Sequence, residues 1–176
     1  MVEIHGAGCA FEHTTFRSDS YAPGGGHRPV SVAFSDRLEA DAFRRDFTVN
    51  ALYADLCTGD ILDPTGGLAD LKAGLLRATS PDPARIMGDD ALRVMRLARF
   101  SGELGFAPEP ATLAAARGNA AGLQEISGER IRDELNKILL ADLKYGKPGA
   151  VYRGLEILES LGALDSVLPE LARRCV

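Results

Sequence analysis

Residues 89–100 read Asp-Asp-Ala-Leu-Arg-Val-Met-Arg-Leu-Ala-Arg-Phe, and this stretch decides how the chain folds. Its apolar residues recur with the 3.6-residue period of an α-helix, which predicts a helix over residues 89–103. Residues three apart are neighbours on a helix surface, so the polar residues of this stretch share one face. This polar stripe consists of Asp90, Arg93 and Arg96, and it is continued by Arg99 or Phe100.

The first two members of the polar stripe could select a nucleotide base. Asp90 offers hydrogen-bond acceptors next to the donors of Arg93. Adenine and cytosine show an amino donor beside a ring-nitrogen acceptor, whereas guanine and uracil show the opposite order on that edge. A carboxylate–guanidinium pair can therefore select A and C over G and U. On spacing alone, an ordinary surface ion pair between the two residues is the simpler explanation.

The chain outside this stretch divides into two parts of different character. Helical periodicity continues toward the C-terminus and predicts helices over residues 110–117, 129–140, 149–161 and 167–172, with Ser127 as the N-cap of the second. Earlier in the chain, β-branched and aromatic runs predict strands over residues 9–16 and 30–34 and a hairpin over residues 51–63. Short helices are predicted over residues 38–44, with Ser35 or Asp36 as the N-cap, and from residue 68 onward. The sequence thus predicts an α+β fold, mixed over residues 1–80 and all-helical over residues 81–176.

Composition limits the classes of protein that need considering. The chain has 176 residues, of which 45% are hydrophobic, and this length can bury a core without disulfides. No stretch approaches the ~20 apolar residues of a membrane span, and we expect no membrane partner. Cys9, Cys57 and Cys175 lie far apart, which argues against a zinc site and suits a cytoplasmic location. The net charge of −5 excludes a global basic field, so RNA would need a local cluster of cations.

A second candidate site lies upstream, where residues 44–50 read Arg-Arg-Asp-Phe-Thr-Val-Asn. The two arginines could hold a triphosphate while Asp46 accepts a hydrogen bond from a ribose hydroxyl. The alternative is a helix C-terminus with favourable cations and a capping Asn50. The pattern alone does not choose between them.

Glu12 is the candidate metal ligand. It lies on the strand predicted over residues 9–16. Mg²⁺ usually takes one or two carboxylates together with phosphate oxygens, and a strand carboxylate can supply one of them. A solvated charge on the outer face of the strand fits the sequence at least as well.

Four motifs follow one another in a fixed order along the chain. They are Arg44-Arg45-Asp46-Phe47-Thr48-Val49-Asn50-Ala51, Asp63-Pro64-x-Gly66-Gly67-x-x-Asp70-Leu71, Asp90-x-x-Arg93-x-x-Arg96-x-x-Arg99-Phe100 and Ser127-x-Glu129-Arg130-Ile131-x-x-Glu134-Leu135-x-Lys137. Within the last motif, Arg130 and Glu134 have the spacing of a structural ion pair. In this order the chain resembles the tRNA nucleotidyltransferase / poly(A) polymerase family, the branch of the DNA polymerase β superfamily that adds CCA to tRNA 3′ ends. The resemblance runs from about residue 11 to the C-terminus.

This resemblance implies a fold, a reaction and a set of site residues. The fold would be a partial nucleotidyltransferase palm, or head, over residues 1–80 and a helical neck over residues 81–176. The reaction would transfer C and A nucleotides from CTP and ATP to the 3′ end of tRNA, with Mg²⁺ as cofactor. The implied roles are phosphate contact for Arg45, sugar contact for Asp46, nucleotide binding for Asn50, base selection for Asp90 and Arg93, extension of the nucleotide site for Arg96 and Arg99, and third active-site carboxylate for Glu12.

The sequence departs from the family at the metal site. The family holds two metal ions on an Asp-x-Asp, which occurs nowhere in this chain, and the nearest analogue is Glu39-x-Asp41. We therefore expect the chain to be inactive alone, either as a fragment of a longer product or because a partner supplies the missing strands. An incomplete sheet would also favour self-association. A poly(A) polymerase and a non-catalytic nucleotide- or RNA-binding module are the alternative functions.

Overall fold

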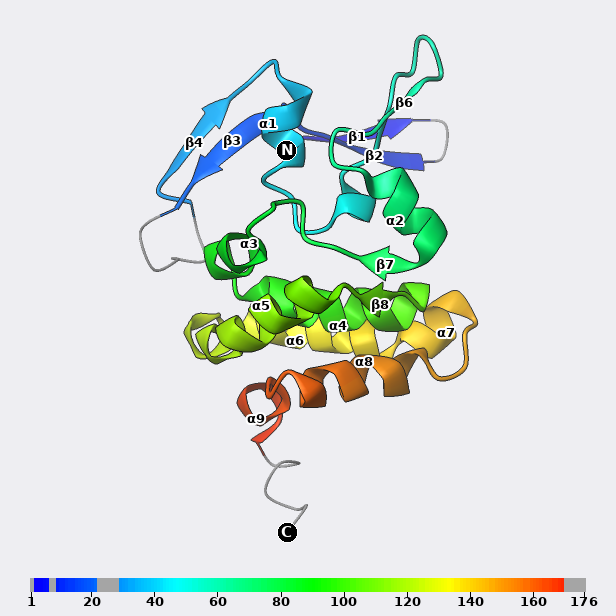
Figure 1. Cartoon of the computed structure of the whole chain (residues 1–176). Helices are drawn as coiled ribbons and strands as arrows, with labels where there is room; N and C mark the ends of the chain where they lie inside the picture. The colour runs from blue at the N-terminus through cyan, green and yellow to red at the C-terminus, as the bar shows by residue number, and fades with distance from the viewer. Residues whose placement is uncertain (1, 7–8, 22–28, 170–176) are drawn as a thin grey trace.

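The computed structural model describes residues 2–6, 9–21 and 29–169, with side chains over 14–21 and 29–169. Figure 1 shows two layers: strand pairs with α1 (Leu38–Ala42) and α2 (Gly67–Ala73) above, and a group of helices around α4 (Leu92–Leu104) below. This arrangement confirms the predicted α+β class. Over the described ranges, no helix has the length and apolar character needed to cross a membrane.

The strands pair two by two. The antiparallel pairs are β1 (Val2–Gly6) with β2 (Cys9–His13), β3 (Arg17–Ser20) with β4 (Ser31–Phe34), and β5 (Tyr53–Ala54) with β6 (Ile61–Leu62). A parallel pair joins β7 (Leu75–Leu76) to β8 (Ala107–Pro108) and so connects the two halves of the chain. In the described part of the chain these pairs form four separate two-stranded sheets. The predicted hairpin and the predicted strand over residues 30–34 are confirmed.

The two helices of the upper layer begin in different ways. The Asp63 carboxylate accepts hydrogen bonds from the backbone N–H groups of Gly67 and Leu68 at 2.7 and 2.9 Å, so the turn before α2 also caps that helix. The cap predicted for α1 is wrong. Ser35 accepts from the backbone N–H of Arg37, and Arg37 itself is the N-cap residue, because the serine hydroxyl is engaged in a local turn.

The helix predicted over residues 89–103 is broken at its start. The first segment, α3 (Pro83–Asp89), ends at Asp90, whose backbone is extended (φ −150°, ψ 107°), and α4 (Leu92–Leu104) begins just beyond. The Asp90 carboxylate accepts a hydrogen bond from the backbone N–H of Leu92 at 3.1 Å. Aspartate favours helix starts over helix interiors, since its side chain can satisfy a free N–H there. Asp90 therefore lies between two helices instead of on the polar stripe.

The remaining helices complete the lower layer. They are α5 (Pro110–Asn119), the 3-10 helix η2 (Ala120–Glu125), α6 (Gly128–Leu139), α7 (Ala141–Tyr145), α8 (Ala150–Ser160) and α9 (Leu164–Val167). The predicted helices over 110–117, 129–140 and 149–161 are confirmed, and Ser127 occupies the predicted N-cap position of α6. The last helix lies earlier than predicted, and residues 170–172 of the predicted one lie outside the described residues.

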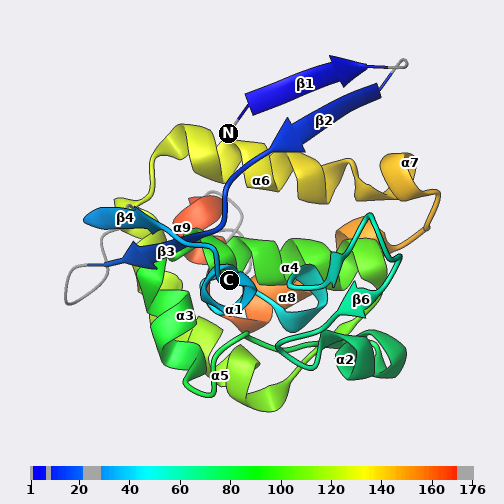
Figure 2. The same ribbon diagram turned by 90° about the horizontal axis from the view of Figure 1, so that it is seen from above.

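The core lies around α4, which packs against α6 and α8 (Figure 2). A Cβ atom added to Gly102 would lie 2.4 Å from the carbonyl oxygen of Ala150, so only glycine permits this approach of α4 to α8. The apolar cluster also takes in Phe47, whose ring packs edge-on against Phe100 with centroids 6.0 Å apart. The segment that follows α1, which includes the 3-10 helix η1 (Thr48–Asn50), is thereby held against α4.

Candidate nucleotide-binding site

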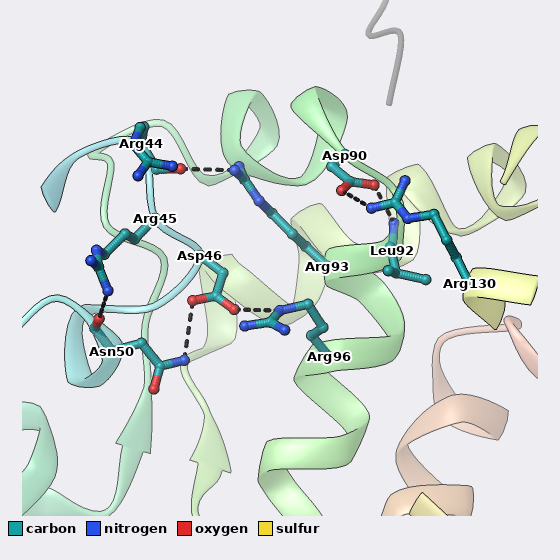
Figure 3. A pocket seen from close by; sticks show the side chains of 9 residues that line it. All are labelled: Arg44, Arg45, Asp46, Asn50, Asp90, Leu92, Arg93, Arg96 and Arg130. Carbon is teal, nitrogen blue, oxygen red and sulfur yellow. Dashed lines mark hydrogen bonds and ion pairs between the residues drawn. The ribbon is translucent and has the colours of Figure 1, made fainter. Parts of the chain in front are cut away.

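A pocket of about 380 Å³ opens where the segment after α1 meets the beginnings of α4 and α6 (Figure 3). Its lining residues are Arg44, Arg45, Asp46, Asn50, Asp90, Leu92, Arg93, Arg96 and Arg130. Five arginines thus face two aspartates, although the whole chain carries a net charge of −5. A local excess of cations in a concave site suits an anionic ligand such as a triphosphate.

Most of the predicted nucleotide-binding residues meet in this pocket. The structure brings together Arg45, Asp46, Asn50, Asp90, Arg93 and Arg96. Arg99 lies outside the lining, and Glu12 lies in β2, where the side chains fall outside the described residues. Sequence reasoning missed Arg130 as a lining residue, because its spacing to Glu134 predicted a structural ion pair.

Asp46 connects the two layers of the molecule. Its Oδ2 accepts a hydrogen bond from Arg96 Nε at 2.7 Å, and its Oδ1 accepts from the Phe47 backbone N–H and from Asn50 Nδ2 at 2.8 and 3.1 Å. Burial by itself would lower the pKa of Arg96, but the attraction of Asp46 outweighs this effect and raises that pKa above its ordinary value. Arg96 is therefore a permanent cation in the pocket wall.

A buried carboxylate holds the two arginines at the end of α1. Asp41 accepts from Arg44 through Oδ1, and from Arg45 Nη2 through Oδ2 at 2.9 Å. Burial would raise the pKa of the Asp41 carboxyl, but hydrogen bonds from Arg44, Tyr53 and Arg45 bring it below its ordinary value. This carboxylate, the second residue of the Glu39-x-Asp41 pattern, is thus engaged in orienting arginines.

The two predicted base-selecting residues are held separately. Arg93 donates from Nη1 to the carbonyl oxygen of Ile86 at 2.7 Å and from Nη2 to the carbonyl oxygen of Arg44 at 2.8 Å. Asp90 accepts from Arg130 Nη2 at 2.6 Å, as Figure 3 shows. Within the described residues, Asp90 and Arg93 do not form the surface ion pair with each other that their spacing also allowed. Each is available to a ligand through its remaining lone pairs or N–H groups.

Arg99 belongs to a buried ion-pair cluster between α4 and α6. Its Nε donates to Glu134 Oε2 at 2.7 Å and its Nη1 to Glu103 Oε2 at 2.9 Å, while Lys137 Nζ contacts Glu134 Oε1 at 2.8 Å. Burial would raise the pKa of Glu134, but Lys137 and Arg99 outweigh it, and the pKa lies below its ordinary value. Glu134 therefore pairs with Arg99, whereas Arg130, its predicted partner, lines the pocket. The cluster fastens α6 to α4, and nucleotide contact by Arg99 stays a prediction.

Two family models match the chain. The model described as "Poly A polymerase head domain" matches residues 1–77, and the model described as "Probable RNA and SrmB- binding site of polymerase A" matches residues 105–175. Together these spans cover most of the chain. The chain belongs to the tRNA nucleotidyltransferase and poly(A) polymerase family. The resemblance inferred from the four motifs is thereby confirmed.

Several members of the family are similar to this chain. The CCA-adding enzyme of Limosilactobacillus fermentum is 48% identical over 144 residues, which is 80% of this chain and 34% of that protein. The structure of the Bacillus stearothermophilus CCA-adding enzyme in complex with CTP is 37% identical, with a TM-score of 0.77 over 92% of this chain and 36% of that one. The Thermotoga maritima CCA-adding enzyme complexed with tRNA is 26% identical, with a TM-score of 0.64 over 75% of this chain and 31% of that one. The chain spans about a third of the length of these relatives.

The family resemblance implies metal ions, and these ions need several carboxylates close together. The described residues do not provide such a group. Over residues 14–21 and 29–169, no three His, Cys, Asp or Glu side chains come together where they could hold a metal ion. The pocket carboxylates, Asp46 and Asp90, are each engaged by an arginine at 2.7 and 2.6 Å. The described side chains therefore do not fit a metal ion.

Proposed function

We propose that this chain functions as a nucleotidyltransferase that adds C and A nucleotides from CTP and ATP to the 3′ end of tRNA, and that the pocket selects the nucleotide. The observation that carries this proposal is the meeting of Arg45, Asp46, Asp90, Arg93 and Arg96 in one pocket. Relatives described as CCA-adding enzymes, one in complex with CTP and another with tRNA, support it.

The triphosphate and the sugar are bound by pocket residues from both layers. Arg45 and Arg96 supply positive charge, and both are already oriented by carboxylates. Arginine suits phosphate because its planar guanidinium donates two parallel hydrogen bonds. A carboxylate has about four lone-pair positions, so Asp46 accepts from a ribose hydroxyl in addition to its protein donors. Asn50, whose Nδ2 contacts Asp46, keeps that carboxylate in place.

The base is selected by Asp90 and Arg93. Asp90 accepts a hydrogen bond from the exocyclic amino group of adenine or cytosine, and Arg93 donates to the adjacent ring nitrogen. Guanine and uracil place a carbonyl where Asp90 needs a donor, so two acceptors face each other. By analogy with bidentate reading of base edges in DNA, such a mismatch costs about 1–3 kcal/mol, or about 5- to 150-fold in affinity.

Titration calorimetry of the purified chain with ATP, CTP, GTP and UTP tests this site. We expect ATP and CTP to bind at least about fivefold more tightly than GTP and UTP. The Asp90→Asn variant should discriminate less, because an amide offers donors as well as an acceptor. The matched control is Asp133→Asn, the same change at an exposed position of α6. Equal binding of GTP and ATP by the parent chain would refute the proposal.

Nucleotide incorporation separates the alternative functions. With tRNA that lacks its 3′ CCA, a CCA-adding enzyme incorporates labelled CMP and AMP, whereas a poly(A) polymerase incorporates AMP without CTP. A non-catalytic binding module incorporates neither. We expect the chain alone to bind nucleotides without incorporating them, since its described residues gather no metal ligands. In this assay the chain alone therefore behaves like a binding module, and its preference for ATP and CTP in the calorimetric titration is what tests the role of the pocket. Robust incorporation by the chain alone would refute the expectation that its metal site is incomplete.

The cofactor, compartment and assembly remain proposals as well. Mg²⁺ is the proposed metal and Glu12 the proposed ligand, on the family resemblance and on the preference of Mg²⁺ for carboxylates. The widely spaced cysteines support a cytoplasmic location. Self-association through open strand edges stays a prediction, which sedimentation velocity at several concentrations would test.

A further inference from the structure

The orientation of Asp90 depends on hydrogen bonds more than on its backbone position. Asp90 lies in the break between α3 and α4, with an extended backbone and without a helical turn around it. Its Oδ1 accepts a hydrogen bond at 3.1 Å from the backbone N–H of Leu92, the first residue of α4. Its Oδ2 accepts from Arg130 Nη2 at 2.6 Å, which comes from a different helix. The second contact therefore determines how the carboxylate is turned toward the pocket.

The helix that carries Arg130 is itself fixed against α4. Glu134, one turn further along α6, is buried and pairs with Arg99 of α4 at 2.7 Å. Residues four apart share a helix face, so Arg130 and Glu134 both project from α6 toward α4 and its N-terminal end. The buried Arg99–Glu134 pair and the apolar cluster that includes Ile138 hold α6 against α4, and this position brings Arg130 to Asp90.

Arg93 is held in a different way. It is pinned by two backbone carbonyls, those of Ile86 and Arg44, at 2.7 and 2.8 Å. Backbone carbonyls move only with the chain, so the donor side of the base-selecting pair is set by the fold. The acceptor side is set by one side chain, Arg130, which is 39% exposed and lines the same pocket.

We propose that Arg130 is a specificity-determining positioning residue, which holds the Asp90 carboxylate in the orientation that accepts the amino group of adenine or cytosine. The inference rests on the proposed function of the pocket. Without Arg130, the carboxylate can turn about its side-chain bonds, and the penalty against guanine and uracil falls because the mismatched acceptor can move away. Arg130 thus acts on the choice of base through Asp90.

The test is the ratio of nucleotide affinities in three variants. Arg130→Met removes the charge and retains much of the length, Arg130→Lys keeps a single donor charge, and Arg132→Met is the control at an exposed arginine on the same helix. Calorimetric titration with ATP and GTP gives the ratio for each, and thermal unfolding checks the fold. We expect Arg130→Met to lower the preference for ATP about fivefold or more, Arg130→Lys to restore part of it, and Arg132→Met to match the parent.

The outcomes separate this inference from the proposed function. If the parent prefers ATP and folded Arg130→Met keeps the same preference, the positioning role is refuted while the proposed function stands. If Arg130→Met weakens ATP and GTP equally, Arg130 contributes charge and not base choice, and the inference is again refuted. If Arg130→Met does not fold, the ratio of Arg130→Lys decides: a reduced preference supports the inference, and an unchanged one refutes it. A parent that binds GTP as tightly as ATP refutes the proposed function and this inference together.

Discussion

All four residues of β4 are exposed, whereas ten of the thirteen residues of α4 are buried. The helix α4 contributes three residues to the lining of the pocket, and β4 contributes none. Arg93 and Arg96 project from a helix that forms the centre of the core. Arg44 and Arg45 follow the short helix α1, and both are held by the Asp41 carboxylate, with Asp19 as a second partner of Arg44. The pocket wall formed by α4 is thus stabilised by apolar packing as well as by ion pairs, whereas Arg44 and Arg45 are held by ion pairs outside the apolar cluster.

The largest expected effect contrasts a core residue of α4 with an exposed residue of β4. Leu97 is fully buried and Phe34 is 77% exposed. Leu97→Ala should lower the free energy of unfolding by about 2–5 kcal/mol, because it leaves a cavity in packed surroundings. Phe34→Ala should change it by less than about 0.5 kcal/mol. Urea unfolding followed by circular dichroism measures both, and similar losses would contradict the contrast.

A smaller effect concerns the close contact of α4 with α8. Gly102→Ala should cost about 1–3 kcal/mol of unfolding free energy, because the added Cβ meets the backbone carbonyl of Ala150, which cannot move alone. Gly118→Ala is the matched control in α5, where the described residues place no atom within 4 Å of the added Cβ. That change should stabilise by about 0.5–1 kcal/mol, since alanine favours helix more than glycine does. The same sign for both variants in thermal unfolding would show that the helices can separate.

The ion pairs of Asp41 with Arg44 and Arg45 give a third test. Tyr53 Oη donates to Asp41 Oδ2 at 2.9 Å, and burial together with this hydrogen bond raises the pKa of Tyr53 to about 12. Tyr53→Phe removes the donor and should cost about 1 kcal/mol of unfolding free energy. Tyr152→Phe, at a tyrosine that is 70% exposed, should cost nothing measurable. Spectroscopic titration should also show that the parent has a tyrosine with a pKa near 12, and that Tyr53→Phe lacks it.

The smallest expected effect is on the pH dependence of stability. Asp41 and Glu134 have pKa values in the folded chain below the ordinary values of 3.8 and 4.5. At a pH above these ordinary pKa values, both carboxylates contribute fully to the free energy of unfolding. As the pH falls, the unfolded chain binds protons first, and the contribution is lost as the pH passes through the pKa of the folded chain. Asp41→Asn and Glu134→Gln should each flatten the acid side of the profile. The measurement is the denaturant midpoint of unfolding at pH values from 6 down to roughly pH 2–3. If the midpoint falls as steeply with pH in the double variant as in the parent, the prediction is refuted.

Local sequence patterns predicted most of the helical layer and most of the pocket lining. The apolar period predicted α5, α6 and α8 with nearly the observed bounds, because each presents one face to the core around α4. The four motifs predicted most of the pocket lining. The same local reasoning failed at Asp90, where a capping side chain outweighs a continuous helical pattern of apolar residues.

By itself, the sequence determined the α+β class, the helices around α4 and the types of residue that gather in the pocket, since these follow from patterns a few residues long. Only the tertiary structure decided the partners: Asp46 with Arg96, Asp90 with Arg130, and Arg99 with Glu134. These pairs join residues that are far apart in the chain, and spacing predicted other pairs for several of them. An ion pair depends on the distance between two side chains in space, and that distance exists only after α4 has packed against α6 and against the segment that follows α1.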